Sequence, residues 1–149
     1  MRQIKFRGKR TDEGGWIYGS LCNYLFNTEN TTRPCIHIGN KGYIRNGFYE
    51  VYPDTIGQFT GLTDCNGKEI YEGDIIHTRN DNRLIVKYGY KEHIVRLNGV
   101  NDSFAAYGWI VENIQNGFTD FLDNECLQCK VIGNIHDNPE LIPNQPTEV

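Results

Sequence analysis

The chain has 149 residues, of which 38% are hydrophobic and 12% aromatic, and its net charge is −4 at pH 7. This length predicts one domain whose core needs no disulfides, and five cysteines without a secretory signal are typical of reduced thiols. The charged start and the lack of a long apolar run argue against a membrane span and make the cytoplasm the expected compartment.

The charges are unevenly distributed. Residues 1–10 carry five basic side chains and no acidic one, and residues 79–96 carry five basic side chains against Asp81 and Glu92. Attraction between segments of one fold explains this asymmetry, and a phosphate-binding face is the alternative.

Short runs of β-branched and aromatic residues, separated by turn residues, predict many strands. In chain order these are Trp16–Leu21, Cys35–Ile38, Phe48–Tyr52, Ile56–Thr60, Ile75–Thr78, Leu84–Tyr88, Ile94–Leu97 and Lys130–Ile135. Ser103–Asn113 fits either a helix or a strand, because its alanines suit one and Trp-Ile-Val the other. A helical turn is expected at Asn138–Leu141, and Pro143–Val149 is expected to fray.

Turn chemistry supports a meandering sheet. Asn-Gly pairs begin at Asn46, Asn66, Asn98 and Asn116, and each suits a type I′ hairpin turn, in which both central residues have positive φ. In residues 63–68 the Asp64 carboxylate is placed to accept a hydrogen bond from the backbone two residues on.

A Gly73-Asp74 corner then precedes two isoleucines, as at the opening of a strand in many small barrels. In a barrel interpretation, Ile75–Thr78, Leu84–Tyr88 and Ile94–Leu97 form a meander. Its turns are expected at residues 80–82 and 89–92.

Three parts of the chain carry a family resemblance. They are Ile4–Arg10 with Gly15–Gly19, Thr55–Leu62 with Asp64 and Asn66–Ile75, and Val131–Ile135 with Asn138–Leu141. Together they resemble the patterns of the YopX family, small bacterial proteins encoded largely by phages and prophages. The resemblance implies a mainly β protein of phage or prophage origin, with a small SH3-like barrel, additional N-terminal strands and little helix. It supplies no catalytic residues.

On this basis the chain is expected to be one YopX-like domain over residues 1–149. Its N-terminal β section covers residues 1–60, its SH3-like barrel section residues 61–140, and its flexible tail residues 141–149.

The cysteines suggest a metal site as one hypothesis. Cys126 and Cys129 have the spacing of a zinc knuckle, and Cys35 with His37 could supply a second pair. The residues after Cys129 suit a strand, however, and residues three apart on a strand point to opposite faces. Thiols without a metal are therefore the favoured state, and no cofactor is expected.

Catalytic chemistry finds little support in the sequence. Glu69, Glu72 and Asp74 could act as acid and base, but a carboxylate beside a Gly corner more often caps it through local hydrogen bonds. Neither Ser20 nor Ser103 lies in a Gly-x-Ser-x-Gly motif. We therefore do not expect an enzyme.

Two binding functions stay open. A protein-interaction module with an unknown protein partner or self-association is favoured, because small β proteins expose edge strands and aromatic residues. The alternative is nucleic-acid binding, in which basic groups attract phosphate and tyrosines stack on bases. Its candidate residues are Arg79, Arg83, Lys87, Tyr88, Tyr90, Lys91 and Arg96.

Overall fold

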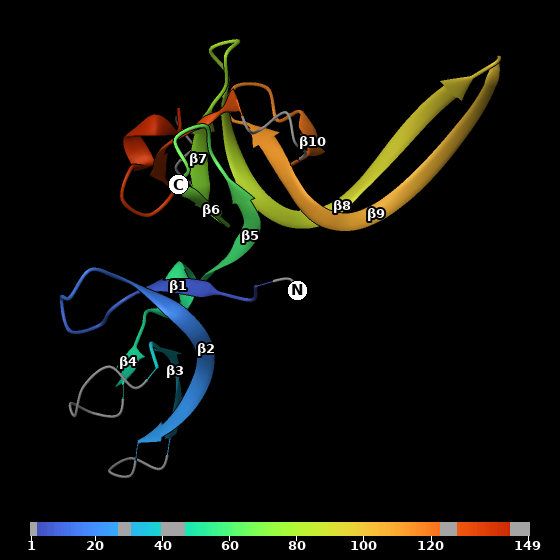
Figure 1. Ribbon diagram of the computed structural model, residues 1–149. Helices are drawn as coiled ribbons and strands as arrows, with labels where there is room; N and C mark the ends of the chain where they lie inside the picture. The colour runs from blue at the N-terminus through green and yellow to red at the C-terminus, as the bar shows by residue number, and fades with distance from the viewer. Residues whose placement is uncertain (1–2, 27–30, 40–46, 123–127, 144–149) are drawn as a thin grey trace, which may run out of the picture. The chain divides into compact units, whose positions relative to one another are not determined.

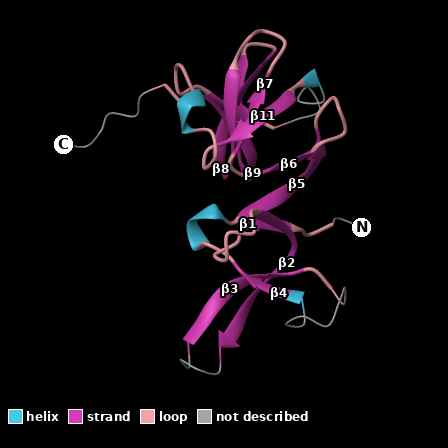
Figure 2. Cartoon of the chain, turned by 90° about the vertical axis from the view of Figure 1, so that its left-hand side faces the viewer, coloured by secondary structure: helices cyan, strands magenta, loops and turns pink. Residues whose placement is uncertain are grey.

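The computed structural model describes residues 3–26, 31–39, 47–122 and 128–143. Strands dominate it, and its helical elements are single 3-10 turns such as Pro53–Thr55 (η2) and Pro139–Leu141 (η4) (Figure 2). The chain divides into two compact units, residues 1–61 and 62–149. Within the described ranges, no helix is long and apolar enough to cross a membrane. The single-domain interpretation stays a prediction.

The first sheet has six strands in the order β4-β3-β2-β1-β5-β6, and β1 to β5 carry the first unit. The strands of this unit are β1 (Phe6–Lys9), β2 (Trp16–Phe26), β3 (Thr31–His37), β4 (Phe48–Glu50) and β5 (Gly57–Thr63), whose last two residues belong to the second unit. Cys35, Ile36 and Val51 are buried in this unit. The strands pack closely here: a Cβ added at Gly8 or Gly19 would lie under 3.0 Å from a neighbour.

Basic side chains of the N-terminal segment lie over aromatic rings of the same unit. The guanidinium of Arg7, only 5% exposed, is 4.8 Å from the Trp16 ring centroid, and that of Arg10 is 4.4 Å from Tyr49. The Lys5 ammonium is 5.8 Å from the Tyr18 ring. Such contacts attract a cation to the negative face of the ring. Part of the basic excess in residues 1–10 is therefore accounted for within the fold.

The second unit contains an antiparallel sheet in the order β10-β9-β8-β7-β11 (Figure 1). Its strands are β7 (Asp74–His77), β8 (Arg83–Leu97), β9 (Val100–Asn113), β10 (Thr119–Phe121) and β11 (Lys130–Asn134), while the short β6 (Glu69–Tyr71) follows β5. A hydrophobic cluster forms its core: Ile70, Ile76, Val86, Val111, Leu122, Cys129 and Val131.

Asp64 ties together the turn between β5 and β6. Its Oδ1 accepts the Asn66 N–H at 2.8 Å, as the sequence predicts for this turn, and also the Lys68 N–H at 2.9 Å. Its Oδ2 accepts the N–H of Val131 at 3.0 Å, from a residue 67 positions further along the chain. One buried carboxylate therefore joins the turn to β11.

The SH3-like barrel is not confirmed. The strands form two antiparallel sheets that do not close into a barrel. The prediction of a turn at residues 89–92 is wrong, because β8 runs without interruption from Arg83 to Leu97. Two predicted strands are thus one, and the ambiguous Ser103–Asn113 lies in strand β9. The long β8 and β9 pair with each other along their whole length, which a meander of short strands does not do.

The positions of the turns were predicted better than their conformational types. The reversal at residues 80–82 and the helical turn near residue 139 are confirmed. Among the described Asn-Gly pairs, however, only Asn98-Gly99 has two positive φ angles, 52° and 81°. At Asn66 and Asn116 only the following glycine has positive φ, so these are other kinds of turn. Asn46 and the terminal residues 144–149 lie outside the described residues.

Candidate interaction surface

Strands β8 and β9 continue as a two-stranded ribbon beyond the rest of their sheet. They pair from Leu84 opposite Asn113 to Leu97 opposite Val100. Strand β7 pairs only with residues 83–85 of β8, and β10 pairs only with residues 110–112 of β9. Residues 87–109 therefore form an arm that pairs with no further strand of the described chain, and Figure 1 shows it extending away from β7.

A pair of glycines removes two side chains from one face of the arm. Gly89 lies opposite Gly108, and a Cβ at Gly89 would lie 3.1 Å from Cδ1 of Ile110. Glycine in a strand often marks a bend, where another group approaches the backbone closely. The ribbon curves strongly over this length in Figure 1. We call this side of the arm the glycine face.

The opposite side carries an aromatic ladder, which we call the tyrosine face: Tyr88, Tyr90, Tyr107 and Trp109. Tyr88 lies opposite Trp109 with ring centroids 5.2 Å apart, and Tyr90 lies opposite Tyr107 at 5.4 Å, both edge to face. Tyr88 is 55% exposed, Tyr90 54% and Tyr107 74%. Three large aromatic side chains are thus held in place by cross-strand pairing and yet face solvent.

Lysines occupy the glycine face and are already engaged. The Lys87 ammonium is 2.6 Å from a carboxylate oxygen of Glu112. The Lys91 ammonium donates to the carbonyl oxygen of Thr119 and lies 4.9 Å from the Phe118 ring centroid. These contacts would compete with a phosphate group for the two ammonium groups.

The structure divides the seven predicted nucleic-acid residues among three places. Tyr88, Tyr90 and Arg96 share the register of the tyrosine face, whereas Lys87 and Lys91 share that of the glycine face. The remaining two, Arg79 and Arg83, are exposed near the turn from β7 to β8 and line separate pockets. Lysines and tyrosines alternate in the sequence of β8, and successive side chains of a strand point to opposite faces. The lysines and the tyrosines therefore lie on different faces of the ribbon.

Sequence reasoning missed the cross-strand half of the tyrosine face. Tyr107 and Trp109 lie in Ser103–Asn113, where the pattern did not distinguish helix from strand. The usable signal was the Asn98-Gly99 pair, a strong hairpin marker that places residues on either side of it opposite one another.

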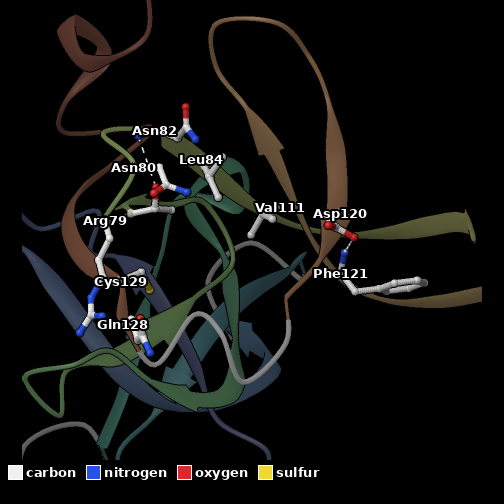
Figure 3. A pocket seen from close by; sticks show the side chains of 10 residues that line it. Arg79, Asn80, Asn82, Leu84, Val111, Asp120, Phe121, Gln128 and Cys129 are labelled. Atoms are coloured by element: carbon white, nitrogen blue, oxygen red, sulfur yellow. Dashed lines mark hydrogen bonds between the residues drawn. The ribbon is translucent and has the colours of Figure 1, made fainter.

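A pocket of about 480 Å³ lies between the turn from β7 to β8, strand β10 and Cys129 (Figure 3). Its lining is mixed: Thr78, Arg79, Asn80, Asn82, Leu84, Val111, Asp120, Phe121, Gln128 and Cys129. The Thr78 hydroxyl accepts the Asn82 N–H at 3.3 Å in the turn from β7 to β8, and an Asp120 carboxylate oxygen accepts the Phe121 N–H at 2.8 Å within β10. Among these lining residues, Cys129 is the sole thiol and no histidine stands beside it to act as a base.

The candidate acid–base carboxylates have structural partners. Asp74 is 1% exposed and accepts the Tyr71 N–H at 2.8 Å, the cap expected for the Gly73 corner. Glu69 accepts the Tyr71 hydroxyl at 2.6 Å. These contacts hold the β6–β7 corner together, so Asp74 and Glu69 have structural roles there.

One of the proposed metal ligands, Cys126, lies outside the described residues. The Cys35 thiol points to the Arg33 carbonyl oxygen at 3.6 Å, and the His37 ring packs on Phe48 with centroids 4.5 Å apart. No group of three or more His, Cys, Asp or Glu side chains in the described part of the chain could hold a metal ion.

Comparison with known proteins identifies one family. The model of the YopX protein family matches residues 5–143. Among solved structures, the chain is similar to the crystal structure of protein EF1440 from Enterococcus faecalis, with 26% sequence identity and a TM-score of 0.42. That match covers 95% of this chain and 99% of EF1440. No curated protein matches the chain.

Proposed function

The chain belongs to the YopX family, and from this premise we propose that it is a non-enzymatic protein-interaction module of phage or prophage origin that acts in the cytoplasm. The observation that supports this function is the tyrosine face, a preformed aromatic surface on an arm that pairs with no further strand of the described chain.

Aromatic residues dominate the binding energy of protein interfaces when they are packed against a partner. Tyrosine and tryptophan are enriched at such positions because they bury a large area and have few rotatable bonds. On this arm the edge-to-face pairs of Tyr88 with Trp109 and of Tyr90 with Tyr107 already restrict the rings. A partner therefore loses little side-chain entropy when it covers them.

Photocrosslinking tests the proposal directly. With a photoreactive phenylalanine analogue in place of Tyr107, we expect irradiation in bacterial extract to attach a discrete protein to the chain. The control carries the same group at Tyr52, which is 48% exposed and lies in the first unit. Identical labelling from both positions, or labelling of nucleic acid alone, would contradict a protein-binding tyrosine face.

Nucleic-acid binding stays the second candidate, favoured by one observation. Tyr88, Tyr90 and the exposed Arg96 share one face, so two rings could stack on bases while a cation meets the backbone. The acidic total and a sequence pI near 5.5 oppose this function outside that face.

Salt-dependent retention on heparin or DNA separates the two candidates. A nucleic-acid binder is expected to bind at low salt and to lose most of its retention when Arg83, Lys87 and Arg96 become alanine. Replacing the exposed Lys68 and Lys130 by alanine controls for general loss of positive charge. A wild-type protein that passes through the column at low salt eliminates the nucleic-acid candidate.

A further inference from the structure

We propose that two copies of this chain pair through the outer edge of β8, antiparallel and about a two-fold axis at Ile94. The inference rests on the proposed interaction function and names a second copy as the first partner of the arm. Three observations support it. They are the direction of the backbone hydrogen-bonding groups at the edge of β8, the order of charges along β8, and the short side chains that lie opposite those charges on β9.

The outer edge of β8 presents a row of backbone donors and acceptors. The Val86 carbonyl oxygen points away from β9, because it accepts the Gly73 N–H, and the Arg83 carbonyl oxygen points towards β9, where it accepts the Ile114 N–H. The uninterrupted register carries this alternation along the strand, so even-numbered residues up to Arg96 direct their N–H and C=O groups outward. Past Val86 no strand of the described chain pairs with this edge.

An edge of this kind is completed most simply by another strand. A two-stranded ribbon alone is marginally stable in water, whereas three or more strands support one another. Two arms joined at β8 would make a four-stranded sheet, with β9 of each copy on the outside. Residue Ile94 would then exchange both backbone hydrogen bonds with Ile94 of the second copy.

The charges on β8 select the register. Glu92, Ile94 and Arg96 share the tyrosine face, and Ile94 is 65% exposed. With the axis at Ile94, Glu92 of each copy lies opposite Arg96 of the other, which gives two ion pairs flanking an apolar contact. An axis at Lys91 or Glu92 would instead place that residue opposite its own copy, and like charges directly opposite are destabilising.

The existing fold leaves room for these contacts. On β9 the residues opposite Glu92, Ile94 and Arg96 are Ala105, Ser103 and Asn101, all with short side chains. Within the described chain neither Glu92 nor Arg96 forms an ion pair. Both charges are thus available to a second copy. The outer edge of β9 offers no such match, since Asp102 is the sole charged residue between Val100 and Gly108.

Sedimentation equilibrium of the purified full-length chain and two reversed variants tests the register. We expect a wild-type dimer whose dissociation constant rises at least tenfold in Glu92→Arg and in Arg96→Glu, because each reversal creates two like-charge pairs. Combining both reversals restores opposite charges and is expected to restore the dimer. Glu140→Arg, an exposed change of the same net charge elsewhere, is expected to leave it unchanged.

The outcomes separate this inference from the proposed function. A wild-type chain that stays monomeric at about 100 μM, or a dimer that survives both single reversals, overturns the β8 pairing. Neither result touches the proposed function if the probe at Tyr107 still crosslinks a different protein. Failure of the double reversal to recover the dimer, with an unchanged circular dichroism spectrum, also overturns it.

Discussion

Replacing Asp64 with alanine is expected to lower the free energy of unfolding by about 3 kcal/mol, since hydrogen bonds to a charged group contribute about 1.5–3 kcal/mol and the variant leaves a buried donor unmet. The carboxylate is 5% exposed and accepts three backbone N–H groups, from Asn66, Lys68 and Val131. Alanine keeps none of them. Urea denaturation at neutral pH measures the loss.

The same carboxylate gives the effect a pH dependence. Burial alone raises the pKa of Asp64, but the hydrogen bonds from Val131, Lys68 and Asn66 together hold it below its ordinary value. A lowered folded-state pKa stabilises the fold fully above the unfolded pKa of about 3.9 and loses that stabilisation as pH falls through the folded value. The stability difference between wild type and Asp64→Ala should therefore be constant near neutrality and shrink in the acid range below about pH 4.

A matched control is Asp102→Ala, which removes an exposed carboxylate from β9 in the same unit. Its free energy of unfolding is expected to stay within about 0.5 kcal/mol of wild type. Equal losses for the two variants would show that Asp64 acts through general charge rather than through its three hydrogen bonds.

Strands with local signals were predictable. The apolar and aromatic runs at Trp16–Leu21, Cys35–Ile38 and Ile75–Thr78 coincide with parts of β2, β3 and β7 because propensity and flanking turns agreed there. The strand β1 was missed, because Phe-Arg-Gly-Lys has a strand's backbone and a charged composition. Its Arg7 is buried by stacking on Trp16, a contact that no periodicity rule detects.

The pairing of β8 with β9 in the arm was not predicted from local sequence patterns. The sequence predicts a turn at Gly89–Glu92, yet pairing with β9 holds Gly89 in an extended strand opposite Gly108. Sheet pairing of this kind is set by partners that are distant in sequence. The tyrosines could therefore be selected from the sequence, whereas the face they occupy, and its separation from Lys87 and Lys91, required the register.

Replacing Gly19 with alanine is expected to destabilise the first unit by about 2–3 kcal/mol, as overpacking of a closely fitted site commonly does. A Cβ at this position would lie under 3.0 Å from the His37 carbonyl oxygen, a backbone atom of the neighbouring strand β3. A flexible side chain could rotate away, but a carbonyl oxygen held in the β2–β3 pairing cannot. The two strands would have to separate, with loss of their hydrogen bonds.

Gly108→Ala is the matched control, because it places the same methyl group on a strand with no atom within 4 Å and no positive φ. There the substitution is expected to be neutral or to stabilise by up to about 1 kcal/mol, through reduced freedom of the unfolded chain. Thermal unfolding followed by circular dichroism compares the two variants. If Gly19→Ala melts at the wild-type temperature, the His37 carbonyl oxygen does not lie within clashing distance of position 19.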